Sequence, residues 1–329
     1  MIGPTKLCPE GIGLVLLDLD DTVVADGTKV SLRVVDAINL ARERGCMVAV
    51  ASGRSFSMVP ELLRRPESMD YLVCANGAAV YDTIGGTLLE HTMSSEQVLR
   101  LMDALKPLHA GWYAFIGDTT YFEWRSFSYM LVGRAPSIKS IRAKDPTSQA
   151  RGPLAGSSKA LHTGMGRFVR RVARTTRRMI TNEEGREQVR SVRKYIEAAD
   201  AGILKVGCSL PTSAACDRAI EVIEHIGGFE AVRMGGHELE ITAAGVTKGL
   251  SARWLMDYLK IDPACAVAFG DSKNDETLRD ACGTFVAMDN GQEYIKGLAD
   301  DVCESVYDDG VARWLERAMA EADGAKHVQ

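Results

Sequence analysis

Residues 14–22 read LVLLDLDDT, a run of large aliphatic residues that ends in three carboxylates within four positions. The aliphatic run predicts a buried strand, because short, solidly apolar segments are typical of strands covered on both faces. Burying one unpaired carboxylate is costly, and neighbouring carboxylates also repel one another. The stretch therefore predicts a strand end at which something neutralises Asp18, Asp20 and Asp21.

Short apolar strands alternate with amphipathic helices along the first third of the chain. Residues 31–45 have apolar positions at helical spacing, with Ser31 as the expected N-cap, and residues 58–65 predict a second helix. The runs CMVAVA (46–51) and YLVCA (71–75) predict strands that end in SGR and NG. This alternation predicts a parallel sheet covered on both faces, in which ligands bind beyond the carboxyl ends of the strands.

The C-terminal part of the chain repeats this pattern. GVTKGLSARWLMDYL (245–259) predicts a loop and a helix, and AVAFGD (266–271) predicts a strand that ends in a carboxylate. TFVAM (284–288) predicts another strand, followed by helices near 293–298 and 311–319. Two distant halves with one style of strand predict a single sheet that is interrupted by an inserted domain.

Composition excludes several classes of protein. The 329 residues are 46% hydrophobic and 25% charged, which is typical of a globular chain, and the net charge of −5 favours neither nucleic acid nor an anionic membrane. No apolar run approaches the roughly 18 residues of a membrane helix, and the N-terminus lacks the pattern of a secretory signal. We therefore expect a cytoplasmic protein.

Cysteine, histidine and glycine patterns exclude other kinds of site. The eight cysteines are scattered without a CxxC pair, so we expect free thiols rather than disulfides or zinc. The six histidines show no HxxxH or HExxH spacing. A nucleotide P-loop, a dinucleotide GxGxxG and a GxSxG serine are also absent from the sequence.

Four motifs carry a resemblance to a known family. They are DLDDT (18–22), the serine in ASGR (51–54), the lysine in GVTKG (245–249), and GDSKND (270–275). In this order they resemble the motifs of haloacid dehalogenase-like (HAD) phosphatases. NGA (76–78), HELEITAAGVTKG (237–249) and VAMDN (286–290) resemble the Cof-type subfamily with a type IIB cap. The resemblance spans most of the chain except a segment near 130–195.

The resemblance implies an α/β fold, with a Rossmann-like doubly wound parallel sheet as core and an inserted α/β cap domain. We expect the core at 1–87 and 241–329 and the cap at 88–240. Within the cap, 201–228 predict a strand and a helix, and 229–242 predict two strands. Five aromatic residues are expected mainly in the cap interior, with a substrate wall as the alternative: Trp112, Tyr113, Tyr121, Phe122 and Trp124.

The function implied is a Mg²⁺-dependent phosphatase that hydrolyses small phosphomonoesters, sugar phosphates being favoured, through an aspartyl-phosphate. The alternative is a non-catalytic phosphometabolite-binding or regulatory protein on the same fold. The chain keeps every motif residue that such degenerate relatives usually lose, which favours the enzyme. The expected partner is a small phosphorylated metabolite, with neither nucleic acid nor membrane, and we expect a monomer or homodimer.

Family roles transfer to the matching residues. Phosphoryl transfer needs an in-line nucleophile, a cation and a proton donor for the leaving oxygen. The resemblance makes Asp18 the nucleophile, Asp20 the general acid–base and Lys248 a catalytic cation. It assigns the Mg²⁺ site to Asp18, Asp20 (through its backbone carbonyl), Asp271 as a direct ligand and Asp275, which would hold a metal-bound water or orient Lys248. It assigns the phosphate oxygens to Ser52, Gly53, Lys248, Asn274 and Asn76.

Two of these positions have alternative interpretations, and two further motif residues, Arg54 and Asp21, also need one. Ser52 also suits a helix N-cap, and Asn76 equally suits a turn that only ends its strand. Arg54 is interpreted as structural rather than as a substrate contact. Asp21 stands where the family most often has glycine, a departure that leaves Asp18 and Asp20 in place.

Residues 134–194 form an unusually basic segment. They hold sixteen Lys and Arg against four Asp and Glu, and six arginines recur at helical spacing over 167–178. The plain interpretation is a cap helix with a solvated basic face. The sharper hypothesis is an electrostatic collar that attracts anionic substrates, or a docking face for an acidic partner.

Overall fold

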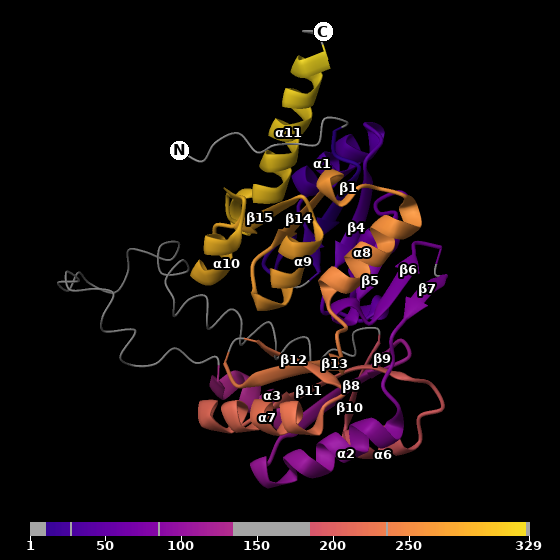
Figure 1. Cartoon of the computed structure of the whole chain (residues 1–329), viewed down its shortest axis with the longest axis vertical. Coiled ribbons are helices and arrows are strands. Elements are labelled where there is room, and N and C mark those ends of the chain that lie inside the picture. The colour runs from indigo at the N-terminus through magenta and orange to yellow at the C-terminus, as the bar shows by residue number, and fades with distance from the viewer. Residues whose placement is uncertain (1–10, 27, 85, 134–184, 235, 327–329) are drawn as a thin grey trace, which may run out of the picture.

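The computed structural model describes residues 11–26, 28–84, 86–133, 185–234 and 236–326. Figure 1 shows two sheets, one in the upper and one in the lower half of the molecule, each accompanied by helices. The upper sheet has eight strands, the lower sheet has six, and a two-stranded hairpin accompanies them in the described part of the chain.

The eight-stranded sheet combines both ends of the chain, in the order β16-β15-β14-β1-β4-β5-β6-β7. Its pairs are parallel from β16 to β5, and β6 and β7 continue it as antiparallel strands. The central strand β1 lies between β4 and β14, which come from distant parts of the sequence, so the predicted interrupted parallel sheet is confirmed. Its strands are β1 (Leu14–Leu17), β4 (Met47–Ala51), β5 (Tyr71–Cys74), β6 (Ala79–Asp82), β7 (Thr87–Glu90), β14 (Ala266–Gly270), β15 (Thr284–Met288) and β16 (Asp301–Cys303).

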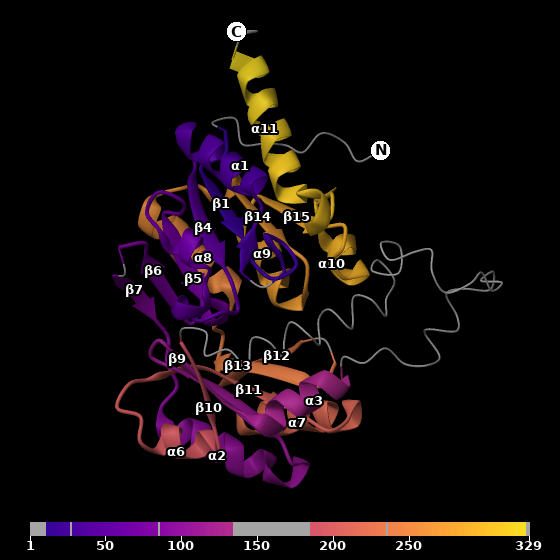
Figure 2. The same ribbon diagram turned by 180° about the vertical axis from the view of Figure 1, so that it is seen from behind.

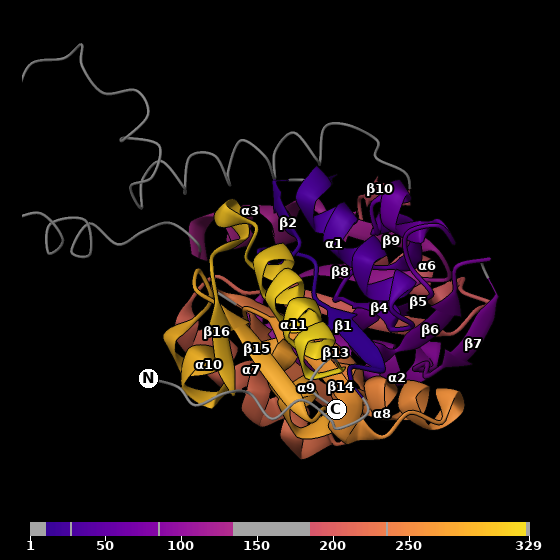
Figure 3. The same ribbon diagram turned by 90° about the horizontal axis from the view of Figure 1, so that it is seen from above.

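Helices cover both faces of this sheet. Helices α1 (Leu32–Glu43) and α11 (Gly310–Lys326) lie on the face visible in Figure 2, whereas α8 (Lys248–Leu259), α9 (Glu276–Ala281) and α10 (Glu293–Leu298) are on the other face. The view from above in Figure 3 places the strands between α1 and the pair α8 and α9. Alternate residues of β1 pack into two hydrophobic clusters, one on each face of the sheet. Leu17 belongs to the cluster with α1 and α11, and Leu16 belongs to the cluster with α8 and α9. The sheet is therefore doubly wound, as predicted.

The first helix begins and ends where the sequence predicts. The Ser31 hydroxyl accepts a hydrogen bond from the Val34 amide at 3.2 Å, which caps the helix start. The chain leaves the helix through Gly45, whose φ of +88° suits glycine best.

The helix predicted over 58–65 is wrong. The chain instead forms two 3₁₀ turns, η1 (Phe56–Met58) and η2 (Glu61–Arg64). Between them Val59 is extended, with φ −65° and ψ 135°, because the proline that follows it disfavours the helical region.

The six-stranded sheet has the order β10-β9-β8-β11-β13-β12 and is antiparallel except for β9 with β10. Helices α2, α6 and α7 cover the face away from the larger sheet (Figures 1 and 2). Its strands are β8 (Gly111–Ile116), β9 (Thr119–Glu123), β10 (Arg186–Val189), β11 (Ile203–Ser209), β12 (Phe229–Met234) and β13 (Glu238–Ala243), and its helices are α2 (Ser95–Leu105), α3 (Trp124–Gly133), α6 (Val192–Glu197) and α7 (Ser213–Ile226). The strands and helix predicted over 201–242 are confirmed.

Short elements complete the described chain. They are the strands β2 (Val24–Asp26) and β3 (Lys29–Val30), and the 3₁₀ turns η3 (Ala75–Gly77), η4 (Lys106–Leu108), η6 (Pro263–Cys265), η7 (Lys273–Asp275) and η8 (Val306–Asp308).

The five aromatic residues have different surroundings. Trp112 packs under the helices, whereas Tyr113 and Phe122 are buried in the cluster shared with the larger sheet. Tyr121 packs at the edge of the helix-side cluster. Trp124 is not interior: it starts α3, is 55% exposed and contacts the ring of Phe127.

Three other predictions concern cysteines, membrane spans and the basic segment. Six described cysteines are free thiols, but Cys265 is disulfide-bonded, so the expectation of free thiols throughout is wrong at that residue.

Among the described residues, no helix combines the length and apolar character needed to cross a membrane. Residues 134–184, and with them the arginines of 167–178, lie outside the described residues, and the basic helix stays a prediction.

Candidate active site

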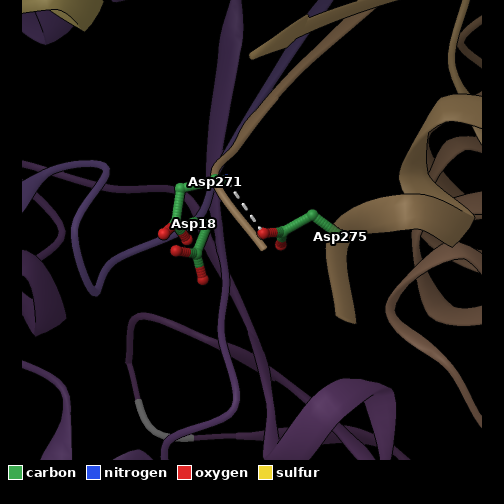
Figure 4. A group of neighbouring side chains, drawn as sticks. All are labelled: Asp18, Asp271 and Asp275. Atoms are coloured by element: carbon green, nitrogen blue, oxygen red, sulfur yellow. Dashed lines mark hydrogen bonds between the residues drawn. The ribbon is translucent and has the colours of Figure 1, made fainter. Parts of the chain in front are cut away.

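Three carboxylates meet at the carboxyl ends of two neighbouring strands. Asp18 follows β1, Asp271 follows β14, and Asp275 ends the turn η7. One oxygen from each lies within 4.8 Å of the others, and Figure 4 shows the three side chains converging. The sequence motifs therefore do bring these residues together in space.

The local backbone explains this convergence. Strands β1 and β14 are parallel with Leu17 opposite Phe269, so both chains reach the sheet edge at the same level. The Asp275 carboxylate then accepts the backbone amides of Asp271 and Ser272, both at 3.1 Å, which fixes the loop (Figure 4). Gly270 is required here, because an added Cβ would lie 2.5 Å from the Asp275 side chain.

Lys248 enters the cluster from the first turn of α8. Its Nζ donates to Asp18 Oδ1 and Asp275 Oδ1, both at 2.7 Å, and its side chain is 0% exposed. The turn is positioned by Thr247, which caps the helix, and by Gly77, whose added Cβ would lie 2.1 Å from the Thr247 carbonyl oxygen.

The electrostatics of the cluster show a deficit of positive charge. Burial, assisted by Asp275 and opposed by Lys248, raises the pKa of Asp18 to about 7. Burial and the charges of Asp18 and Asp275 also raise the pKa of Asp271 well above its ordinary value. Burial tends to lower the pKa of Lys248, but Asp18 and Asp275 outweigh it and the pKa is raised, so the lysine stays charged.

A divalent cation with a preference for oxygen fits this cluster. Buried carboxylates that hold protons at raised pKa are stable once a hard ion replaces those protons. The donors are carboxylate oxygens, the ligands that Mg²⁺ takes in proteins. Asp18, Asp271 and Asp275 are therefore suited to such an ion, with Lys248 as the fixed cation beside it.

Asp20 lies outside this cluster, in a separate ion pair. Its side chain is 56% exposed, and its two oxygens accept Arg54 Nη2 at 2.7 Å and Nε at 2.9 Å. The guanidinium of Arg54 is buried and also donates to the Met58 carbonyl at 3.0 Å. These contacts agree with the structural interpretation of Arg54, which holds the Asp20 carboxylate in place.

The turn between Asp20 and Thr22 is stabilised by a hydrogen bond from Asn290, a residue far away in the sequence. Asp21 has φ +63°, the left-handed region that favours glycine, which explains why glycine suits this position. Its carbonyl accepts the Asn290 amide at 2.7 Å, and Asn290 in turn accepts the Val306 backbone amide at 2.7 Å.

Ser52 and Gly53 follow β4 at the same sheet edge. Ser52 Oγ accepts the Arg54 backbone amide at 3.2 Å. The helix N-cap alternative for Ser52 is wrong, because the chain turns through 53–55 and the first 3₁₀ turn starts only at Phe56.

Asn76 and Asn274 join the site from two other loops. Asn76 is buried in the left-handed conformation (φ 59°, ψ 30°) after β5, as a strand-ending turn requires. Its Oδ1 also accepts Asn274 Nδ2 at 3.2 Å, so the side chain reaches the loop after β14. Both interpretations of Asn76 stay open, since one residue makes the turn and the contact.

Two charged residues of the smaller sheet were missed from sequence. Lys205 on β11 donates to the Gly53 carbonyl at 2.5 Å, and Glu240 on β13 accepts Asn76 Nδ2 at 2.6 Å. A signal existed: Lys205 interrupts an apolar strand, and Glu238 and Glu240 alternate with Leu239 and Ile241, which places both glutamates on one face.

Comparisons with known proteins cover nearly the whole chain. A family described as haloacid dehalogenase-like hydrolase matches residues 15–315. Phosphatase YwpJ of Bacillus subtilis is 23% identical over 310 residues, 93% of this chain and 99% of the relative. Two solved structures share the fold: a haloacid dehalogenase-like hydrolase from B. subtilis (TM-score 0.73, 22% identity, 93% of this chain and 99% of that chain) and a subclass IIB sugar phosphatase (TM-score 0.67, 15% identity, 93% and 98%).

Proposed function

The chain belongs to the Cof-type haloacid dehalogenase-like hydrolases. From this we propose that it is a Mg²⁺-dependent phosphatase of small phosphomonoesters with a IIB cap, like the sugar phosphatase of the same fold. The observation that carries the proposal is the buried contact of Lys248 with Asp18 and Asp275 beside Asp271. Such a set suits the transfer of a phosphoryl group, whose negative charge needs neutralising partners.

In the proposed reaction Asp18 is the nucleophile. A carboxylate oxygen of Asp18 attacks phosphorus, the bond from phosphorus to the ester oxygen breaks, and an aspartyl-phosphate forms. Asp20 gives a proton to the departing oxygen and then takes one from the water that hydrolyses the intermediate. Its exposed carboxylate, held by Arg54 at the edge of the cluster, supports this role because it can exchange protons with substrate and solvent.

The proposed metal ligands are Asp18, the backbone carbonyl of Asp20, Asp271 and Asp275. Bound Mg²⁺ would neutralise the carboxylates and the phosphate and keep Asp18 ionised at neutral pH. Asp275 has a second task in this proposal: it holds Lys248 through one oxygen and the loop amides through the other.

Fixed donors are proposed for the phosphate oxygens that do not react. These are the Ser52 hydroxyl, the Gly53 backbone amide, Lys248 and the Asn274 amide, with Asn76 supporting Asn274. Donors held in place before substrate arrives lower the barrier, because they need no reorganisation during the reaction.

The smaller sheet and its helices are proposed as the cap that selects the leaving group. The cap expected at 88–240 is bounded by β7, which ends at Glu90 in the larger sheet, and by β13, which ends at Ala243 in the smaller one. We therefore put the junctions near these two residues. Sugar phosphates are the favoured substrates, in line with the sugar phosphatase of the same fold.

A panel of phosphorylated metabolites with Mg²⁺ tests the proposal. Phosphate release is measured from sugar phosphates, pyridoxal phosphate, flavin mononucleotide and p-nitrophenyl phosphate, with EDTA and the Asp18→Asn variant as controls. Release that EDTA and Asp18→Asn both abolish is the expected result. A wild-type chain that binds phosphate but hydrolyses none of the panel would instead favour the non-catalytic binding protein.

A further inference from the structure

Two charged side chains of the smaller sheet are buried over the proposed phosphate loops. Lys205 Nζ and Glu240 Oε1 are 2.7 Å apart, and the side chains are only 1% and 12% exposed. A buried ion pair is by itself weak evidence for stability, because the loss of hydration offsets the attraction. The contacts that the pair makes with the larger sheet indicate a different use.

Lys205 acts on the loop that follows β4. Its Nζ donates to the Gly53 carbonyl at 2.5 Å and lies 4.5 Å from the centroid of the Phe115 ring. The peptide group that carries this carbonyl also carries the Arg54 amide, which donates to Ser52 Oγ at 3.2 Å. A cation on the oxygen polarises that peptide and strengthens the Arg54 amide as a donor. Because Ser52 Oγ accepts this bond, its own proton is free to point toward a phosphate.

Glu240 acts on the loop that follows β5. Its Oε2 accepts Asn76 Nδ2 at 2.6 Å, which leaves Asn76 Oδ1 to accept Asn274 Nδ2 at 3.2 Å. An amide can otherwise rotate and exchange its donor and acceptor ends. The carboxylate therefore decides which end of Asn76 faces Asn274.

The protonation of the pair suits these tasks. Burial tends to raise the pKa of Glu240, but the Lys205 charge and hydrogen bonds from Lys205, Asn76 and Tyr113 outweigh it, and the pKa lies below its ordinary value. Burial and the charges of Glu240 and Glu238 raise the pKa of Tyr113, so its hydroxyl stays a donor to Glu240 at 3.0 Å.

The fit around Gly53 shows how closely the two sheets meet. A Cβ at Gly53 would lie 2.9 Å from Asn76 Oδ1, and 3.4 Å from both Glu240 Oε2 and Lys205 Nζ. Side chains of the smaller sheet thus close directly over a residue of the proposed phosphate site.

We propose that Lys205 and Glu240 are positioning residues that orient Ser52 and the Asn76–Asn274 pair for phosphate only while the cap is docked. The inference rests on the proposed function, which assigns those donors to phosphate. It makes cap docking and phosphate binding one coupled equilibrium: a docked cap raises phosphate affinity, and bound phosphate favours docking to the same degree.

The test measures binding of inorganic phosphate to the full chain by titration calorimetry in the presence of Mg²⁺. Lys205→Met removes the charge, and the double variant Lys205→Met/Glu240→Gln avoids leaving a lone buried carboxylate while keeping an acceptor for Asn76. Lys205→Met/Glu240→Met removes that acceptor as well. Arg193→Met is the control. It also removes a cation, but one that lies on helix α6 and pairs with Asp103 at the surface.

The expected result is a roughly tenfold weaker dissociation constant for the Gln double variant, as for loss of one charge-assisted contact, and a further severalfold loss for the Met double variant. Arg193→Met should bind phosphate as the wild type does. Melting temperature shows whether each variant is folded: a purely structural pair would leave phosphate affinity unchanged once the Gln double variant folds.

Either of two results overturns the inference: wild-type phosphate affinity in both double variants, or an equal loss in Arg193→Met. The proposed function fails independently. If the wild type hydrolyses no ester, the proposed phosphatase is refuted. If the double variants but not Arg193→Met then still bind phosphate more weakly than the wild type, the positioning role stands.

Discussion

Replacing Lys248 with methionine tests the charge balance of the site without any substrate. The substitution keeps the bulk of the side chain but removes its positive charge. With the charge go two ion pairs of 2.7 Å, one with Asp18 and one with Asp275. Removing one partner of a buried pair typically costs about 3–5 kcal/mol. At about 2–3 °C per kcal/mol for a chain of this size, the melting temperature should fall by roughly 6–15 °C.

The pH dependence of that loss has a definite sign. Asp18 already has a pKa raised from 3.8 to about 7 in the folded chain, so the folded state binds a proton that the unfolded state has lost between those values. Stability from this group is present at low pH and is lost as pH rises toward 7. Without Lys248 the pKa rises further, so the deficit against wild type should be larger at about pH 8 than at about pH 5.5.

Mg²⁺ supplies the comparison that refutes or supports the reasoning. Differential scanning fluorimetry with and without millimolar Mg²⁺ should show that the ion recovers part of the lost melting temperature, because it neutralises the same carboxylates. Lys205→Met is the matched control: this lysine is also buried and ion-paired, but Glu240 is not part of the carboxylate cluster. A deficit in Lys248→Met that neither acid nor Mg²⁺ reduces, or equal recovery in Lys205→Met, would show that charge balance is not what Lys248 provides.

Three further predictions concern the DLDDT turn, and a fourth concerns the ion. Asp18→Asn should abolish phosphate release with an unchanged circular dichroism spectrum, and activity within about tenfold of wild type, about 1.4 kcal/mol of barrier, would rule out the nucleophile. Asp20→Asn should be nearly inactive but bind Mg²⁺ normally in calorimetry, since only its backbone carbonyl is assigned to the ion; lost affinity would contradict that role. Asp21→Gly should resist urea better by up to about 1 kcal/mol, because it relieves the left-handed backbone at φ +63°; a less stable variant would refute this. Mg²⁺ binding to the wild type should release protons and become tighter as pH rises through about 7, the pKa of Asp18. Calorimetry in buffers of different ionisation enthalpy measures this release, and a binding enthalpy that does not depend on the buffer would contradict the prediction.

The interior of the fold was predictable because buried strands have a distinctive composition. Strands β1, β4 and β14 are short and solidly apolar, and only a sheet covered on both faces accommodates three of them. The edges were not predictable in this way. Strands β6, β7 and β16 are short or partly exposed and carry polar residues, so that pattern alone does not separate them from loops.

Individual residues of the candidate site could be predicted from their local sequence, but the contacts between residues far apart in sequence could not. Asp18 and Asp271 each end an apolar strand, and a carboxylate at that position is unusual enough to be noticed in the sequence alone. The pairing of Asp20 with Arg54, and of Glu240 with Asn76, depends on how loops far apart in sequence fold against one another. A single sequence holds no spacing rule for such contacts.

The close approach of Gly77 to Thr247 bears on how caps can be exchanged between proteins. Strand β13 ends at Ala243, and the link 244–247 ends at Thr247, whose carbonyl packs against Gly77 in the turn after β5 just before Lys248 begins its helix. The position of Lys248 is thus fixed by a contact with the core, although this lysine follows the cap in sequence. A chimaera joined at Ala243 inherits the lysine's position intact, whereas a graft that includes the link must also bring a matching glycine. Recombination in this architecture is therefore limited by a backbone contact between Gly77 and Thr247, the immediate neighbours of Asn76 and Lys248 in the proposed phosphate site.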